Sequence, residues 1–319
     1  MAERTMLIGD IGGTNARFAL SALDAPGFSC EETLQCADFD TADAAIARYL
    51  ENVGITAPDV ICLAAAGPVI DHTIRFTNNN WCITAAELRE TYPGAAIRLL
   101  NDFEAIAYSV PFLSTQSRLT ERDQFTVAIV GPGTGLGTAG LKKVGNRLIP
   151  IVSEASHKGF APETALQREV LDVLRGRFDR VSVERLVSGG GLENLHWAIC
   201  QLRGSDSGSL SAEEIFAAKD YQSIETVQLF FELLGQYAGD IALAFGAADG
   251  VFIAGGIVRR YPETFEASRF RAGFESKGRY RSYMESIPTA LITHPEPGLL
   301  GASYVALDSL RGTEVMPTS

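Results

Sequence analysis

The sequence lacks several features that mark particular classes of protein. It has no run of lysine and arginine, and its formal net charge of −12 disfavours binding to nucleic acid, which usually needs a basic patch. No apolar segment reaches the roughly 18 residues that span a bilayer, and the polar residues 1–4 do not begin a signal peptide. The five cysteines form no CxxC pair and are odd in number, which disfavours a disulfide framework or a zinc site. These absences favour a cytoplasmic protein that binds neither nucleic acid nor membrane.

Two widespread nucleotide-binding motifs are also missing. The sequence contains no GxxxxGK[ST], the loop that holds phosphates in many nucleoside triphosphatases. Residues 135–140 match the letters GxGxxG, but residues 141–152 read as a strand and hairpin, whereas a dinucleotide site needs a helix there. We therefore interpret this match as a false positive.

Strands, glycine-rich turns and helices alternate along the chain. A strand, a glycine-rich turn and a returning strand occupy residues 5–20, and the same pattern recurs at 125–143, about 120 residues later. A third buried strand runs into Gly255 and Gly256, and residues 163–245 read mainly as helix. This pattern predicts an α/β fold with mixed sheets and hints at a duplication. With 319 residues, 46% of them hydrophobic, the chain can form two lobes, each with its own core.

Glycine-rich turns after strands suit phosphate, because backbone N–H groups can approach an anion where no Cβ stands in the way. Each turn taken alone is explained equally well as a tight hairpin. Residues 9–15, 131–137 and 255–256 together resemble, in order and spacing, the two phosphate motifs and the adenosine motif of the sugar kinase, heat-shock chaperone and actin ATPase superfamily.

This resemblance implies two ribonuclease-H-like (actin-like ATPase) lobes with ATP and Mg²⁺ in an interlobe cleft. It assigns residues 1–112 to a small lobe, completed by a helix at 299–310, and residues 113–298 to a large lobe. Residues 311–319 read as a disordered tail. Asp10 would approach Mg²⁺ through water. The implied nucleotide-binding residues are Gly9, Asp10, Gly12, Gly13, Thr14, Asn15, Gly133, Thr134, Gly135, Gly137, Gly255 and Gly256.

Within the superfamily, the chain most resembles the bacterial glucokinases, from residue 7 to about residue 307. The implied activity is transfer of the terminal phosphate of ATP to the 6-hydroxyl of glucose, and relatives suggest a homodimer. The resemblance is carried by GDIGGTNARFAL (9–20), TNNNW (77–81), LLNDFEAIA (99–107), GPGTGLG (131–137), SEASHKGFAP (153–162), VSVERLVSGGGLENL (181–195), GVFIAGGIV (250–258) and PGLLGA (297–302).

Phosphorylation of a hydroxyl needs a base near the attacking oxygen. Asp102 follows an apolar strand and precedes a helix, so on local sequence alone it reads as a helix N-cap. The resemblance makes it the candidate catalytic base. Each hydroxyl of a bound hexose also needs a donor or an acceptor. The implied sugar-binding residues are Asn78, Asn101, Asp102, Glu154, His157 and Glu184.

Structural explanations for these residues stay open. Asn78 can simply shape its loop, His157 can be structural, and Glu184 can be a solvated glutamate at a helix start. Ala155 and Ser156 stand where the family usually has glycines, so either the backbone there needs no positive φ or the loop is set differently.

Three other functions remain as alternatives. The first is a kinase of broader hexose specificity, and the second is a non-catalytic sugar sensor. Many relatives of the second kind carry a cysteine-rich zinc segment, which is absent here. The third is a polymerising or chaperone ATPase, which would lack the clustered polar residues at 78, 101–102, 154–157 and 184.

Overall fold

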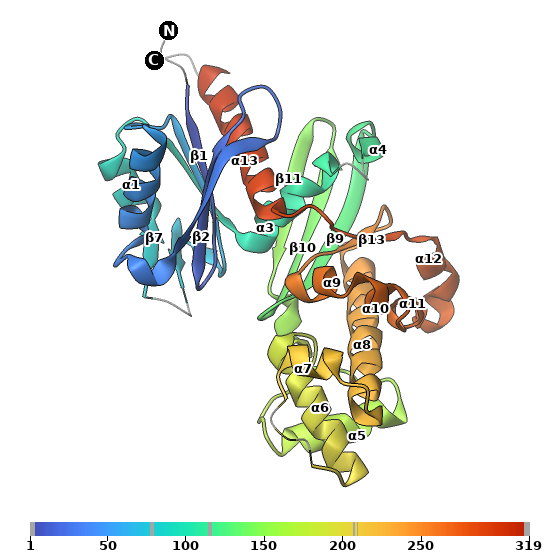
Figure 1. Cartoon of the computed structure of the whole chain (residues 1–319). Helices are drawn as coiled ribbons and strands as arrows, with labels where there is room; N and C mark the ends of the chain where they lie inside the picture. Colours follow the sequence, from blue (N-terminus) through green and yellow to red (C-terminus); the bar gives the residue numbers. More distant parts are fainter. Residues whose placement is uncertain (1–3, 77–79, 114–116, 207, 209, 316–319) are drawn as a thin grey trace. The chain divides into compact units, whose positions relative to one another are not determined.

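The computed structural model describes residues 4–76, 80–113, 117–206, 208 and 210–315 (Figure 1). Its contacts divide the chain into two compact units. The first unit comprises Met1–Asp123, Gly145–Val152 and His294–Ser319, and the second comprises Gln124–Val144 and Ser153–Thr293. The lobes expected from the sequence end at residues 112 and 298. Among the described residues, no helix is long and apolar enough to cross a membrane.

The first unit is built on a five-stranded sheet of order β3-β2-β1-β4-β8. Strands β1 and β2 form an antiparallel hairpin around the first glycine-rich turn, and β4 and β8 continue the sheet parallel to β1. The strands are β1 (Met6–Ile11), β2 (Asn15–Ser21), β3 (Phe28–Gln35), β4 (Val60–Ala65) and β8 (Ala96–Asn101).

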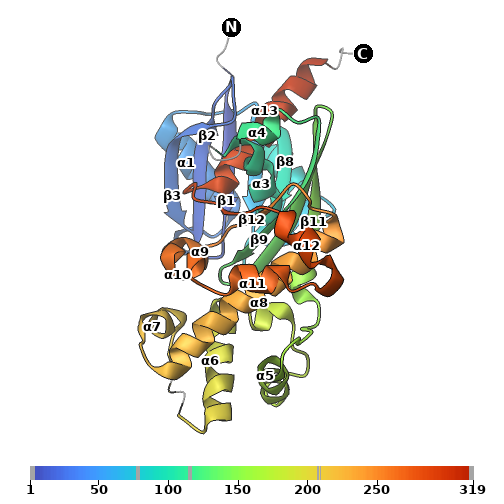
Figure 2. The same ribbon diagram turned by 90° about the vertical axis from the view of Figure 1, so that its right-hand side faces the viewer.

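Helices cover both faces of this sheet, because alternate side chains of a strand point to opposite faces. Leu7 and Ile11 of β1 pack in the core formed with α1 and α2, whereas Met6 and Ile8 pack in the core that includes α13. Figure 2 shows α13 beside β1, although it comes from the far end of the chain. These helices are α1 (Ala42–Val53), α2 (Ala85–Thr91), α3 (Asp102–Ser109) and α13 (Pro297–Val315).

Smaller elements complete this part of the chain. Thr84 caps α2 by accepting a hydrogen bond from the backbone N–H of Glu87. A three-stranded antiparallel sheet precedes α2, and short helices occur in the connections. They are β5 (Val69–Ile70), β6 (Thr73–Arg75), β7 (Cys82–Thr84), η1 (Cys36–Asp38), η2 (Val110–Phe112) and α4 (Ser117–Thr120).

A second five-stranded sheet has the order β11-β10-β9-β12-β13. It repeats the plan of the first sheet: β9 and β10 form an antiparallel hairpin around a glycine-rich turn, and β12 and β13 run parallel to β9. The two strand–turn–strand patterns found in the sequence thus lie at the same place in two sheets of the same strand order. The strands are β9 (Gln124–Pro132), β10 (Leu136–Val144), β11 (Arg147–Ser153), β12 (Val251–Ile253) and β13 (Thr289–Leu291).

Helices form most of the remainder of the second unit. The 25-residue helix α8 supplies the centre of its core, including Phe230, Leu234 and Tyr237. The helices are η4 (Ala155–His157), α5 (Ala165–Arg175), η5 (Val183–Arg185), α6 (Gly189–Arg203), α7 (Ala212–Ala217), α8 (Tyr221–Phe245), α9 (Gly256–Arg260), α10 (Pro262–Glu266), α11 (Phe270–Glu275), η6 (Gly278–Tyr280) and α12 (Arg281–Ser286).

The structure confirms the expected α/β class with mixed sheets. It also confirms that residues 135–140 are no dinucleotide motif, because they lie in and before strand β10. The disordered tail expected for 311–319 is wrong for 311–315, since α13 continues to Val315. Arg311 there donates a hydrogen bond from Nη2 to the carbonyl oxygen of Asp24, at 3.2 Å.

Candidate functional site

Asp10 lies near the carboxyl end of β1, beside the first turn of α13. Because side chains alternate along the strand, it shares a face with Met6 and Ile8, the face on which α13 packs. The approach is close enough that a Cβ atom on Gly298 would lie 2.5 Å from Asp10 Oδ2. Glycine at 298 therefore leaves room for the Asp10 carboxylate.

Several charges surround the Asp10 carboxyl group. Burial and the nearby Asp102 raise its pKa from 3.8 to about 7, and Arg17 opposes this rise. Arg17 is also engaged elsewhere, because its Nη1 donates a 2.8 Å hydrogen bond to Oε2 of Glu296. The first unit therefore holds a partly buried carboxylate whose negative charge is incompletely balanced.

Such a carboxylate fits magnesium as the resemblance implies. Mg²⁺ prefers oxygen ligands and is commonly held by one or two carboxylates together with water and substrate phosphates. Within the described ranges, no group of three or more His, Cys, Asp or Glu side chains is arranged to hold a metal ion. The donor set fits a metal that arrives with a nucleotide better than a resident ion in a protein cage.

The first glycine-rich turn is held by backbone hydrogen bonds. Gly12 N–H donates to the carbonyl oxygen of Asn15 at 2.9 Å, and the carbonyl oxygen of Thr14 accepts from Cys36 N–H at 2.8 Å. Gly9 lies inside β1, where the space of a side chain is filled by Leu63 and Phe18. A larger side chain at position 9 would therefore collide with the packed side chains of Leu63 and Phe18.

Asn101 and Asp102 mark the junction of β8 and α3. Asn101, not Asp102, is the N-cap: its Oδ1 accepts from the N–H groups of Phe103 at 2.9 Å and Glu104 at 3.3 Å. Its Nδ2 donates to the carbonyl oxygen of Gly67 at 3.0 Å. The N-cap alternative for Asp102 is therefore wrong, and Asp102 is the first residue of α3, with Oδ1 2.9 Å from Phe103 N.

In the second unit, the structure brings three sequence-predicted residues together. His157 Nε2 lies 3.9 Å from Glu154 Oε2, and His157 Nδ1 lies 3.8 Å from Glu184 Oε1. Glu154 and His157 come from the segment after β11, and Glu184 from η5. Glu154 and His157 are more than half exposed, whereas the Glu184 side chain is 29% exposed. The cluster offers donors and acceptors that solvent can reach.

The segment between Glu154 and His157 is a single turn of 3₁₀ helix. The non-glycine residues with positive φ in the described chain are Cys30, Asp71 and His72, so Ala155 and Ser156 are not among them. Of the two explanations for the missing glycines, the structure supports the first, in which the backbone needs no positive φ.

The second glycine-rich turn lies beside this cluster. It is shorter than the sequence indicates, because β9 continues through Pro132 and β10 begins at Leu136. Glu184 Oε2 accepts a 3.0 Å hydrogen bond from the backbone N–H of Leu136. A side chain predicted to bind sugar thus touches the turn predicted to bind phosphate.

Gly255 is required by its conformation. It has φ 98°, and a Cβ atom there would collide with the carbonyl oxygen of Pro132 at the end of β9. Gly256 opens α9, with open space where its side chain would be. The strand, turn and helix start predicted around residues 251–257 are therefore present.

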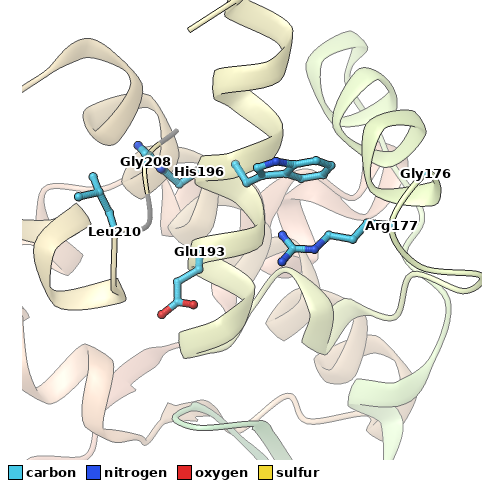
Figure 3. A pocket seen from close by; sticks show the side chains of 7 residues that line it. Gly176, Arg177, Glu193, His196, Gly208 and Leu210 are labelled. Carbon is cyan, nitrogen blue, oxygen red and sulfur yellow. The ribbon is translucent and has the colours of Figure 1, made fainter. Parts of the chain in front are cut away.

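One cavity in the second unit is lined by none of the site residues described above. It has a volume of about 380 Å³, and its lining includes Arg177, Glu193 and Trp197. Figure 3 shows the side chains of Arg177 and of Glu193, which lies on α6. The Arg177 guanidinium carbon lies 5.1 Å from the centre of the Trp197 ring. None of the residues lining this cavity was predicted as a site residue.

Comparison with known proteins identifies the family. A family model described as Glucokinase matches residues 7–309. The chain belongs to the glucokinase family. The glucokinase of Marinobacter nauticus is 39% identical over 314 residues, 95% of this chain and 97% of that protein. The glucokinase of Caulobacter vibrioides is 41% identical over 309 residues, 93% of each. The crystal structure of a glucokinase from an Antarctic psychrotroph matches with a TM-score of 0.84 and 32% identity, covering 96% of this chain and 99% of that one.

This membership confirms the family and fold expected from the motifs. Sequence reasoning missed Glu296 and Gly298, which lie beside Asp10 but are almost 290 residues away along the chain. The only sequence signal near them is the family-like segment 297–302. Asn78, predicted to bind the sugar, lies outside the described residues.

Proposed function

We propose that this chain is an ATP-dependent glucokinase that transfers the γ-phosphoryl group of ATP to the 6-hydroxyl of glucose. The observation that carries the proposal is the pair of carboxylates Asp10 and Asp102 in the first unit, in a chain that matches the glucokinase family over residues 7–309. Asp10 is the second-last residue of β1 and Asp102 directly follows β8, and these two strands run parallel in the same sheet. Each can then take a different role in phosphoryl transfer.

Asp102 acts as the general base. As the 6-oxygen of glucose attacks the γ-phosphorus, the bond from phosphorus to the β-bridging oxygen breaks and ADP leaves. The hydroxyl proton passes to the Asp102 carboxylate. A weakly basic carboxylate suffices because the transition state is loose and the proton moves late.

Asp10 is the residue that would hold Mg²⁺, through water. When bound with ATP, the ion supplies positive charge that neutralises the phosphates and favours the ionised form of Asp10. The nucleotide phosphates are assigned to the backbone of the two glycine-rich turns, residues 12–15 and 133–137, and the adenosine to Gly255 and Gly256. Backbone N–H groups in such turns bind anions without a charged side chain.

The sugar is assigned to the cluster of Glu154, His157 and Glu184, with Asn78, Asn101 and Asp102. The two carboxylates accept hydrogen bonds from sugar hydroxyls, and the imidazole can donate or accept. An analogue that lacks a hydroxyl leaves one of these groups unpaired, which costs about 1–3 kcal/mol of binding free energy. The cluster therefore selects for hydroxyl pattern.

The test is an assay of ADP formation with a panel of hexoses at fixed Mg²⁺-ATP. We expect the highest kcat/KM with glucose and a product phosphorylated at the 6-hydroxyl. Equal values for mannose, fructose and an N-acetylated hexose would support the broader hexose kinase instead. Sugar binding without turnover of any hexose would refute the enzyme and favour a sugar sensor.

A further inference from the structure

The Glu184 carboxylate has two different neighbours. Its Oε2 accepts the 3.0 Å hydrogen bond from Leu136 N–H, at the point where the glycine-rich turn passes into β10. Its Oε1 lies 3.8 Å from His157 Nδ1, in the cluster assigned to the sugar. One side chain thus connects the nucleotide turn with the sugar cluster, entirely inside the second unit.

The turn is held at both ends by this part of the chain. Gly133 N–H donates to the carbonyl oxygen of Gly135 at 2.8 Å, which closes the turn. Gly189 N–H, at the start of α6, donates to the carbonyl oxygen of Gly133 at 2.8 Å. The backbone of Glu184 is also held, because its carbonyl oxygen accepts a hydrogen bond from Ser188 Oγ at 2.8 Å. The start of α6 therefore holds one end of the turn, and the Glu184 side chain holds the other.

We propose that Glu184 is a positioning residue for the nucleotide turn, and that it couples the binding of sugar to the binding of nucleotide. The proposal rests on the proposed function, since it takes Glu184 as a sugar ligand. A hydroxyl that donates to the Glu184 carboxylate fixes its rotamer, and this rotamer is the one that holds Leu136 N–H. A bound sugar then lowers the entropy cost of ordering the turn around phosphate.

The coupling must act in both directions, because linkage between two binding sites is reciprocal. A nucleotide that orders residues 133–136 holds Glu184 in place for the sugar. The chain offers a natural comparison in Glu154, which faces the same histidine from the other side, at 3.9 Å. Among the described residues, Glu154 accepts no hydrogen bond from the turn, so it serves as the matched control.

The first experiment measures nucleotide binding without sugar. Calorimetric titration with Mg²⁺ and a non-hydrolysable ATP analogue is compared for wild type, Glu184→Ala and Glu154→Ala. We expect Glu184→Ala to weaken analogue binding about tenfold, the usual effect of losing one hydrogen bond to a charged group. Glu154→Ala should stay within about twofold of wild type. Glu184→Gln, whose amide oxygen still accepts, should recover most of the loss.

The second experiment tests the reverse direction with glucose alone. A Cβ atom on Gly135 would lie 2.7 Å from Glu184 Oε2, whereas one on Gly133 would have no atom within 4 Å. Neither glycine has a positive φ, so alanine fits the backbone at both positions. We expect Gly135→Ala to weaken glucose binding several-fold without touching the sugar, and Gly133→Ala to leave it unchanged.

The outcomes separate this proposal from the proposed function. If Glu184→Ala weakens glucose binding but leaves analogue binding like that of wild type, the positioning role is refuted. Equal losses of analogue binding in Glu184→Ala and Glu154→Ala would also refute it. If wild type fails to bind or phosphorylate glucose, the proposed function fails, and the two analogue titrations still decide whether Glu184 positions the turn. Circular dichroism shows whether each variant is folded. If Glu184→Ala does not fold, Gly135→Ala tests the same contact between Glu184 and the turn.

Discussion

Replacement of Asp10 by asparagine should stabilise the protein while abolishing its activity. The carboxyl group of Asp10 has a pKa of about 7 in the fold against 3.8 in a model compound, mainly because burial disfavours its charge. At pH 8 the ionised group therefore lowers the free energy of unfolding, by at most about 4 kcal/mol. Asparagine has nearly the same shape and carries no charge, so Asp10→Asn removes this cost.

The pH dependence has a definite sign. Between pH 4 and 7 the folded state binds more protons at Asp10 than the unfolded state, so its contribution to stability falls as pH rises. The gain in Asp10→Asn should thus be near zero at about pH 4 and reach its full size at about pH 8. Asp40→Asn, which changes an exposed carboxylate in the same unit, is the control variant.

The assay is urea unfolding followed by tryptophan fluorescence, with EDTA present and nucleotide absent. The sequence has two tryptophans, and Trp81 is buried in the first unit whereas Trp197 belongs to the second. In a Trp197→Phe background the signal reports on the unit that contains Asp10. We would then compare the free energy of unfolding of Asp10→Asn with that of its parent at pH 5 and at pH 8. If the difference is the same at both pH values, the idea that burial raises the pKa of Asp10 is refuted.

Three further changes test the rest of the site. Asp102→Asn should keep glucose binding, measured by calorimetry, and lose about 10²-fold to 10⁴-fold in kcat; near-normal turnover would contradict its role as base. Gly298→Ala should raise the Mg²⁺ concentration that gives the half-maximal rate, because its Cβ would crowd Asp10 Oδ2 at 2.5 Å. It should also weaken the binding of Mn²⁺, measured by electron paramagnetic resonance. Gly312→Ala, in the same helix with open space, is its control, and equal metal binding in the two variants would exclude crowding. Gly301→Ala should lower the melting temperature without a specific change in metal affinity, because its Cβ would overlap a backbone carbonyl of α3.

The parts of the fold that the sequence predicts are local. The two hairpins were predictable because each consists of a buried strand, a glycine-rich turn and a returning strand within about 20 residues. The surroundings of Asp10 were not predictable from the sequence, because Glu296 and Gly298 come close to Asp10 only when α13 packs on β1. The same holds for the contact of Glu184 with the turn before β10, which depends on the path of about 48 intervening residues. Propensity does not encode such contacts.

The two hairpins share a plan but differ in the chemistry of equivalent positions. In the first, Asp10 pairs across the strands with Arg17, one step before the last pair, Ile11 with Ala16. In the second, the pair one step before the last is Gly131 with Gly137. A carboxylate in the first hairpin can bind a cation, whereas two glycines in the second leave only backbone groups, which suit phosphate oxygens. The two hairpins therefore share a strand order while the equivalent positions differ in the ligands that they can bind.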